Sequence, residues 1–322
     1  MSMLGRTLIA DPLARLLQRR PGPRLPHGLS FAELPARTET VTIPTRHGDI
    51  RAVVYWPEAG GDLVPVYVNF HGGGFVVRYP EQDDPLCRYL AARAGVAVVN
   101  VDYDVAPDHR FPEPVEEAYD AVRWAAGPRH GWDGSRLCVG GQSAGGSLAA
   151  AAARLALEQD GPAIALQVLH YAVLDLVTSP RDKRAPGQRV TSVAMERLFD
   201  AVYFPSPEAS RDRLASPAWG ANGDGIAGIA PALVITCEVD RLHDEGVAYA
   251  GKLAAVGALH GHLDLPGAGH GYNLYVKDRL LVENSYARIA KHVTAATAGQ
   301  HRRPDRSAGT VGLPAAPPGR GL

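Results

Sequence analysis

The chain lacks an excess of positive or negative charge, and this balance argues against some classes of partner. Its 322 residues contain 33 Lys and Arg against 34 Asp and Glu, for a formal net charge of −1. A near-neutral chain has no general electrostatic attraction for nucleic acid or for an anionic membrane. We therefore expect a small-molecule partner and no nucleic-acid partner.

Cysteine is also scarce. The three cysteines, Cys87, Cys138 and Cys237, form no C-x-x-C pair. An odd number without paired spacing argues against a disulfide framework and against a zinc site, and it favours a reducing compartment. Cys138 and Cys237 lie in apolar runs, where cysteine acts as a small hydrophobic residue. We expect no metal site.

A long apolar run is the third missing feature. No stretch approaches the roughly 20 apolar residues of a membrane span. The short apolar run near the N-terminus is broken by Asp11 and Pro12, which is not typical of a signal peptide. Together these absences predict a cytoplasmic protein that does not insert stably into a membrane.

Strand-like and helix-like segments alternate through residues 36–298. Three runs rich in β-branched and aromatic residues come first: VTIP (41–44), IRAVVYW (50–56) and VPVYVNF (64–70). Helical and apolar strand-like runs then follow one another up to a last helix near residues 280–296. Such alternation predicts an α/β fold, with a central, mostly parallel, eight-stranded sheet and helices on both faces.

Three segments depart from this alternation. Residues 1–35 precede the first strand and contain one predicted helix, which begins at Asp11-Pro12. Residues 176 to about 230 are polar and rich in proline, with one helical stretch, VTSVAMERLFDAVYF (190–204). We interpret them as an insertion over the edge of the sheet. Residues 299–322 are rich in Gly, Pro and Arg, and we predict that they are disordered.

The motif GQSAG (141–145) carries the strongest indication of chemistry. It follows the strand-like run RLCVG (136–140) and opens an alanine-rich helix. A G-x-S-x-G motif in that context predicts a sharp strand-to-helix turn that exposes the hydroxyl of a nucleophilic serine, here Ser143. The small residues Ala144 and Gly145 let the helix approach the sheet closely.

A second motif, HGGGF (71–75), comes directly after the strand-like run 64–70. Consecutive glycines leave backbone N–H groups free to converge on an anion, and this pattern forms the oxyanion-hole loop of lipases and esterases. His71 is expected to hydrogen-bond the loop into shape rather than to take part in the reaction.

A nucleophilic serine needs a base, and the base needs a group that orients it. Asp240 directly follows the apolar run ALVITCEV (232–239), and His270 lies in PGAGHGY (266–272). Both follow Ser143 in the chain order Ser, Asp, His of α/β-hydrolases, and both stand where strands end. Other acidic and histidine candidates lack one of these features: Glu238, Asp244, His243, His260 and His262.

The motifs together resemble the hormone-sensitive-lipase-like family of bacterial esterases. The resemblance extends over about residues 36–295 and includes HGGGF, VDYDVAPDHRFP (101–112), GGQSAGGSLA (140–149), LASPAWG (214–220) and PGAGHGY, in the family's order. It implies an α/β-hydrolase fold with a small helical cap made by residues 1–35 and 176–230. It also implies hydrolysis of short- to medium-chain esters without a cofactor, and a homodimer through the last sheet strand.

Position by position, the resemblance implies a triad of Ser143, Asp240 and His270. The backbone N–H groups of Gly73, Gly74 and Ala144 would form the oxyanion hole. Five aromatic residues are candidates for lining the substrate pocket, and packing of the cap onto the body is an equally open interpretation for each: Phe75, Phe199, Tyr203, Phe204 and Trp219.

The sequence departs from the family at several positions near these motifs. The family usually has Asp at position 142, where Gln142 stands, and Arg or Ser at position 104, where Asp104 stands. We hypothesise that these two side chains face each other in a hydrogen bond. Arg241 replaces a proline of the family, and we expect it to have no contact with the reacting groups.

Two other functions remain open. The triad does not by itself choose the leaving group, so an amide or formamide hydrolase is an alternative to a serine carboxylesterase. A non-catalytic small-molecule receptor of the same fold is the alternative from another class. Receptors that resemble these enzymes lose the catalytic histidine, and the presence of His270 argues against that function.

Overall fold

The fold comes from a computed structural model, which describes residues 6–20, 22, 25–26, 28–58, 63–128, 130–184 and 192–298. Eight strands form one sheet in the order β1-β2-β4-β3-β5-β6-β7-β8. The pairs β1·β2 and β2·β4 are antiparallel, and the other five pairs are parallel. The strands are β1 (Arg37–Thr45), β2 (Gly48–Trp56), β3 (Val64–Phe70), β4 (Ala97–Asp102), β5 (Trp132–Gln142), β6 (Leu166–His170), β7 (Ala232–Cys237) and β8 (Leu259–Leu265).

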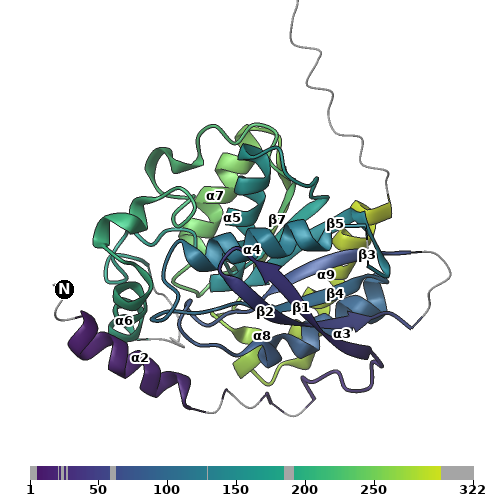
Figure 1. Cartoon of the computed structure of the whole chain (residues 1–322), viewed down its shortest axis with the longest axis horizontal. Helices are drawn as coiled ribbons and strands as arrows, with labels where there is room; N and C mark the ends of the chain where they lie inside the picture. Colours follow the sequence, from purple (N-terminus) through teal and green to yellow (C-terminus); the bar gives the residue numbers. More distant parts are fainter. Residues whose placement is uncertain are drawn as a thin grey trace, which may run out of the picture.

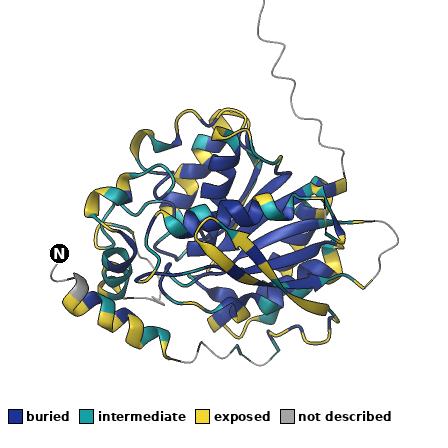
Figure 2. Cartoon of the chain, in the orientation of Figure 1, coloured by how far each residue is buried: buried dark blue, intermediate teal, exposed yellow. Residues whose placement is uncertain are grey.

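Helices cover both faces of this sheet (Figure 1). On one face α4 (Glu113–Ala125), α5 (Ala144–Glu158) and α7 (His243–Ala255) pack on the strands, and on the other α3 (Asp84–Ala94) packs with α9 (Arg279–Ala298). Strands β4, β6 and β7 are buried along their whole length, as expected for strands covered on both sides. Figure 2 shows this buried centre beneath helices that are exposed on their outer sides. The predicted α/β-hydrolase architecture is confirmed.

The segments outside the alternation supply two further helices, α2 (Asp11–Gln18) and α6 (Val193–Tyr203). They lie in contact at one end of the molecule (Figure 1). Arg110 joins them to the body, because its guanidinium donates to Asp11 at 2.7 Å and also to the carbonyl of Val202. The tail predicted to be disordered, residues 299–322, lies outside the described residues.

One strand is shorter in the structure than the sequence predicts. The apolar run 163–176 predicts a single long strand, but β6 ends at His170. Tyr171 has a φ of 36°, a left-handed conformation that turns the chain out of the sheet. The rest of the run therefore becomes a loop at the same edge of the sheet as Ser143.

Candidate active site

Ser143 lies at the junction of β5 and α5 in a strained conformation. Its φ of 55° and ψ of −120° are unusual for a residue with a side chain, and its N–H donates to the carbonyl of His170 at 2.9 Å. The flanking glycines are required by space: a Cβ on Gly145 would lie 1.9 Å from the Phe70 carbonyl oxygen, and one on Gly141 would lie 2.4 Å from it. The predicted strand-to-helix turn is present.

A continuous line of hydrogen bonds runs from this serine to a buried carboxylate. Ser143 Oγ lies 3.0 Å from His270 Nε2, and His270 Nδ1 lies 2.8 Å from Asp240 Oδ2. Asp240 follows β7, and His270 lies between β8 and the short helix α8 (Tyr272–Tyr275). The structure thus brings together the three side chains that the sequence analysis selected, from the ends of three strands.

The electrostatics of His270 favour its protonated form. Burial lowers the pKa of this imidazole, but the charge of Asp240 and the hydrogen bond with it outweigh burial, so the pKa is raised above its ordinary value. An imidazole held this way can accept a proton from the serine hydroxyl through Nε2, because Nδ1–H is committed to Asp240.

The glycine loop before Ser143 is held in shape by buried polar contacts. His71 Nδ1 lies 2.6 Å from the carbonyl oxygen of Gly72, and Gln82 donates to that oxygen at 2.7 Å. The Tyr103 hydroxyl donates to the His71 carbonyl at 2.9 Å, and the two rings are stacked. Burial lowers the pKa of His71 to about 4, so it is neutral near pH 7. The predicted loop-shaping role of His71 is confirmed.

Gly73 and Gly74 need to be glycine because their φ values are 138° and 61°. Within the described residues, their N–H groups have no backbone or side-chain acceptor, and both residues line the same pocket as Ser143. Ala144 is buried as the first residue of α5, where helix N–H groups have no partner within the helix. The loop and the helix start can therefore present donors to an oxyanion at Ser143.

The pocket in front of these residues has a volume of about 250 Å³. One wall comes from the glycine loop and the strand ends, and the other comes from residues 173–183, α6 and the segment after Asp240. Its lining residues are Gly72, Gly73, Gly74, Phe75, Val77, Tyr79, Gln82, Gln142, Ser143, Tyr171, Val173, Asp175, Leu176, Thr178, Pro180, Lys183, Glu196, Phe199, Asp200, Val239, Asp240, Arg241, Leu242, His270, Gly271, Leu274 and Tyr275.

The five aromatic candidates divide between the two interpretations. Phe75 and Phe199 line the described pocket, and Tyr203, Phe204 and Trp219 do not. Tyr203 and Phe204 are buried, and the Tyr203 ring stacks on Phe75 with ring centroids 4.0 Å apart. Trp219 lies under the Arg211 guanidinium. The pocket expectation is therefore corrected for these three, since Tyr203 and Phe204 pack α6 onto the body.

The hypothesis that Gln142 pairs with Asp104 is wrong. Gln142 Nε2 donates to the buried Asp83 carboxylate, and Gln142 Oε1 accepts hydrogen bonds from Tyr171 at 2.5 Å and from Asn273 at 2.8 Å. Burial raises the pKa of Asp83 to about 7. The β5 strand turns the Gln142 side chain toward α3 and α8.

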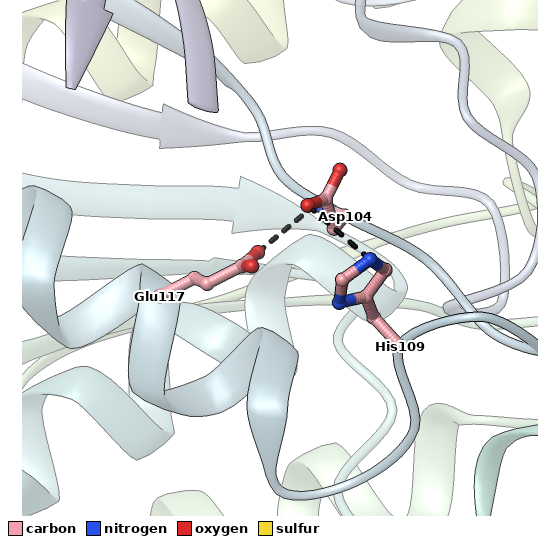
Figure 3. Close-up of side chains that lie close together, drawn as sticks. All are labelled: Asp104, His109 and Glu117. Carbon is pink, nitrogen blue, oxygen red and sulfur yellow. Dashed lines mark hydrogen bonds and ion pairs between the residues drawn. The ribbon is translucent and has the colours of Figure 1, made fainter. Parts of the chain in front are cut away.

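Asp104 faces a different set of side chains. It lies close to His109 and Glu117 (Figure 3), and it accepts a hydrogen bond from Arg78 at 2.9 Å. The hypothesis rested on two joint departures from the family, but β3 lies between β4, which precedes Asp104, and β5, which carries Gln142.

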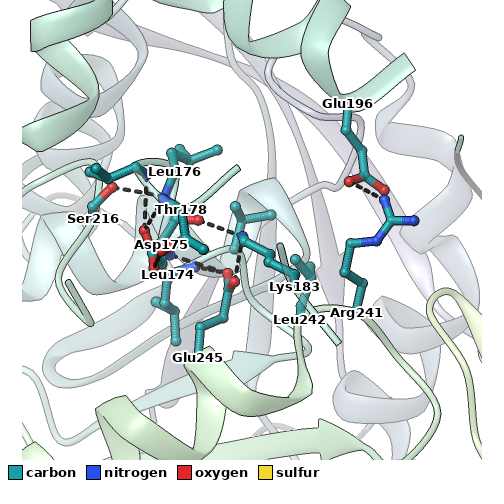
Figure 4. A network of polar contacts seen from close by, with 12 residues as sticks. Leu174, Asp175, Leu176, Thr178, Lys183, Glu196, Ser216, Arg241, Leu242 and Glu245 are labelled. Carbon is teal, nitrogen blue, oxygen red and sulfur yellow. Dashed lines mark hydrogen bonds and ion pairs between the residues drawn. The ribbon is translucent and has the colours of Figure 1, made fainter. Parts of the chain in front are cut away.

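Charged side chains at the pocket belong to a network of polar contacts, which includes Lys183, Glu196 and Arg241 (Figure 4). Lys183 pairs with Glu245, whose other oxygen accepts from the N–H groups of Leu174 and Asp175 at 2.7 and 3.1 Å. Burial lowers the pKa of Lys183, but the charge of Glu245 and the hydrogen bond with it raise the pKa by more. The pKa is therefore above its ordinary value, and the ammonium keeps its charge. Arg241 forms an ion pair with Glu196 of α6.

No sequence motif points to these charged side chains at the pocket. Arg241 lies closer to the site than we expected, because it lines the pocket beside Asp240 and ties that segment to α6. Its replacement of a family proline was the one available signal. Lys183 and Glu245 are 62 residues apart in the chain, and no local pattern connects them.

No helix in the described part of the chain combines the length and the apolar composition that a bilayer crossing requires. Residues 67–274 match the family model described as alpha/beta hydrolase fold. The chain is 33% identical over 265 residues to carboxylesterase NlhH of Mycobacterium tuberculosis, covering 80% of each chain. It is 37% identical over 206 residues to an ethyl acetate hydrolase of Pseudomonas putida, covering 63% of this chain and 64% of the relative.

A solved structure is similar over nearly the whole chain. It is a hyperthermophilic esterase from the archaeon Pyrobaculum calidifontis, with 34% sequence identity and a TM-score of 0.75. The match covers 93% of this chain and 99% of the archaeal one.

Proposed function

The chain belongs to the alpha/beta-hydrolase family, in its hormone-sensitive-lipase-like branch, and we propose that it is a serine carboxylesterase with Ser143 as its nucleophile. The observation that carries the proposal is the hydrogen-bonded line from Ser143 Oγ to His270 and on to Asp240, at 3.0 and 2.8 Å. The ester activity named for the similar proteins supports the choice of reaction.

In the proposed first step, Ser143 Oγ attacks the ester carbonyl carbon while His270 Nε2 accepts the hydroxyl proton. Asp240 holds the imidazole in the tautomer with its proton on Nδ1 and stabilises the imidazolium that forms. The carbonyl electron pair moves onto oxygen, where the N–H groups of Gly73, Gly74 and Ala144 stabilise the oxyanion.

The tetrahedral intermediate then collapses. The bond to the alcohol oxygen breaks, the alcohol takes the proton from His270, and an acyl ester remains on Ser143. Water attacks this acyl-enzyme with His270 again as base, and the acid leaves as Ser143 recovers its proton. The chain's own side chains supply every proton transfer in this scheme.

We propose that the N-terminal segment up to residue 35 and the insertion 176–230 together cap the pocket. The contact between α2 and α6 and the position of Phe199 in the pocket wall support this. A pocket of about 250 Å³ fits short- to medium-chain acyl groups better than long ones. Initial rates on p-nitrophenyl esters from acetate to palmitate would measure the acyl-chain preference. From the size of the pocket, we expect the highest rates with acyl chains of about two to eight carbons.

The cytoplasmic location and the homodimer through the last strand stay predictions. The strand β8 lies at one end of the sheet, where its outer edge can pair with a second copy. Light scattering on the purified protein would give the oligomeric state, and a charged substitution in β8 would show whether this edge is used.

The test of the function is the Ser143→Ala variant assayed on p-nitrophenyl butyrate and on the matched anilide. We expect ester turnover by the wild type to exceed anilide turnover, and the variant to lose ester turnover while keeping its folded circular dichroism spectrum. Ser135→Ala is the matched control, because Ser135 lies at the exposed beginning of the same strand. Preferred cleavage of the anilide would instead support an amide hydrolase.

A further inference from the structure

A second cluster of histidine and carboxylates lies at the end of β4. Asp104 follows that strand, His109 lies in the next loop, and Glu117 points to them from α4 (Figure 3). One potential ligand atom from each of the three residues lies within 4.8 Å of the others. None of the three lines the described pocket, so the cluster is separate from the proposed esterase site.

Each of the three side chains has one polar atom held by a neighbour. Asp104 Oδ1 accepts from Arg78 at 2.9 Å, and Glu117 Oε2 accepts from the backbone N–H of Asp104 at 2.9 Å. His109 Nδ1 lies 3.0 Å from a carboxylate oxygen of Glu113. Contacts of this kind orient the ligands of protein metal sites, and a carboxylate behind the histidine is one of them.

Each of the three side chains has a second polar atom that forms no hydrogen bond with those neighbours. Asp104 Oδ2 and His109 Nε2 lie 3.6 Å apart, too far for a hydrogen bond. Glu117 is fully buried, and among the described residues its Oε1 atom has no hydrogen-bond partner. A buried carboxylate oxygen without a partner is costly, and a bound cation would remove that cost.

We propose that Asp104 Oδ2, His109 Nε2 and Glu117 Oε1 bind a divalent cation of the zinc or manganese class. One imidazole with two carboxylates is a mixed nitrogen and oxygen donor set, which suits these ions better than calcium or magnesium. Ligand atoms around tetrahedral zinc lie about 3.4 Å apart, given bonds of about 2.1 Å. The 3.6 Å between Asp104 and His109 is already close to that separation.

The surrounding charge is consistent with a cation. Arg78 is the guanidinium at the cluster, and it is shared with Asp102, which accepts from Arg78 Nε at 2.6 Å. The cluster therefore gathers the carboxylates of Asp104, Glu113 and Glu117 around the His109 imidazole and the guanidinium that Asp104 shares with Asp102. Asp104 and His109 are partly exposed, so an ion can reach the site from solvent.

The cation would brace the loop that supports the glycine loop of the active site. The loop after β4 donates from the Ala106 N–H to the Phe75 carbonyl at 2.9 Å, and from the Phe111 N–H to the Tyr203 carbonyl at 3.0 Å. An ion held by Asp104, His109 and Glu117 would fix both ends of this loop to α4. We assign it a structural role, outside the ester reaction.

The expectation of no metal site rested on cysteine spacing alone. The present proposal does not depend on the proposed function, and its readouts need no ester substrate.

The test is calorimetric titration of the full-length protein, first treated with EDTA and desalted, with ZnCl₂ and with MnCl₂. A pair of surface histidines, His260 and His292, lies 3.0 Å apart and could itself bind zinc. All titrations therefore use the His260→Gln protein as the starting point. We expect one equivalent of ion to bind, and the melting temperature to rise and fall again when EDTA is added.

Three further substitutions in that protein test the ligands. His109→Asn and Glu117→Gln should abolish the titration and the shift in melting temperature, and Glu113→Gln should weaken binding about 10- to 100-fold. His109→Asn changes a partly exposed loop residue, so it serves even if Glu117→Gln reduces folding. Absence of binding for both ions, or binding that survives in His109→Asn, would overturn the proposal.

Discussion

The proposed catalytic triad and the Asp104–His109–Glu117 cluster lie at the same edge of the sheet and have one arrangement in common. In each, a carboxylate faces Nδ1 of a histidine: Asp240 behind His270, and Glu113 behind His109. The clusters differ in what the other ring nitrogen faces. Nε2 of His270 lies against the hydroxyl of Ser143, whereas Nε2 of His109 lies against the Asp104 carboxylate, with Glu117 close by.

This difference decides the chemistry that each cluster supports. A histidine between one carboxylate and one hydroxyl can move a proton, provided that a pocket and free N–H donors stand beside the hydroxyl. A histidine that joins converging carboxylates has no nucleophile to activate, and in our proposal its Nε2 is a metal ligand instead. The imidazole–carboxylate pair alone is therefore no evidence for catalysis.

The two clusters should differ most when the carboxylate that faces Nδ1 of the histidine is neutralised in each. Asp240→Asn should lower kcat on a short ester by about 10⁴-fold, because the imidazole loses its tautomer and its counter-charge. Glu113→Gln should leave kcat unchanged. Steady-state kinetics on p-nitrophenyl butyrate measure both, and a fall of less than tenfold for Asp240→Asn would count against the proposed role of Asp240.

The glycine loop is the part of the first cluster that the second lacks. A Cβ on Gly74 would lie 2.3 Å from Phe199, and its φ is 61°, so Gly74→Ala should displace a proposed oxyanion donor. Loss of one such donor costs about 10²- to 10³-fold in kcat. We expect Gly74→Ala with Phe199→Ala to recover only part of that loss, because the backbone strain remains. Full recovery would assign the effect to the steric clash alone.

Replacing Gln142 by the residue usual in the family tests the buried contacts of the residue that precedes Ser143. Gln142→Asp places a second carboxylate beside buried Asp83, whose pKa burial has already raised to about 7. A carboxyl with a raised pKa contributes stability at low pH and loses it as pH rises through the folded-state pKa. We expect a loss of about 2 kcal/mol in unfolding free energy at pH 8.

Urea unfolding at pH 5 and pH 8 measures this change. The loss should be smaller at pH 5, where the carboxyl pair can keep a proton. Equal losses at the two pH values would show that packing, and not charge, causes the effect.

The smallest expected effect is on the pH profile. The raised pKa of His270 predicts that kcat/KM falls on the acid side with a midpoint above the ordinary histidine value of about 6.5, because the protonated imidazole cannot act as base. The rate should therefore increase with pH through that midpoint. His109→Asn should leave the midpoint where it is, and a displaced midpoint would mean that the two clusters are coupled.

The features that could be predicted from the sequence are those that short motifs specify. Ser143 and His270 each sit in a glycine-rich turn directly after a strand, and Asp240 ends an apolar run, so local patterns placed all three at strand ends. The eight strands followed from the same alternation. The early end of β6 could not be predicted, since it depends on the left-handed conformation of Tyr171 in an otherwise apolar run.

Contacts between distant segments were beyond the sequence. One partner of Gln142 is Asp83, and the two residues meet because β5 and the start of α3 share one end of the sheet. The pairs Lys183–Glu245 and Arg241–Glu196 depend on how the inserted segment folds over the body. Asp104, His109 and Glu117 likewise converge through the course of one loop, which no residue spacing specifies.

The most direct test of the central claim is the site of covalent labelling by a fluorophosphonate. The wild-type protein is treated with the probe, digested and examined by mass spectrometry, with the EDTA-treated protein in parallel. We predict that the label is found on Ser143 alone, with or without metal, and that ester turnover is lost in proportion to labelling. Label on another serine, or an active protein that takes up no label, would contradict the account.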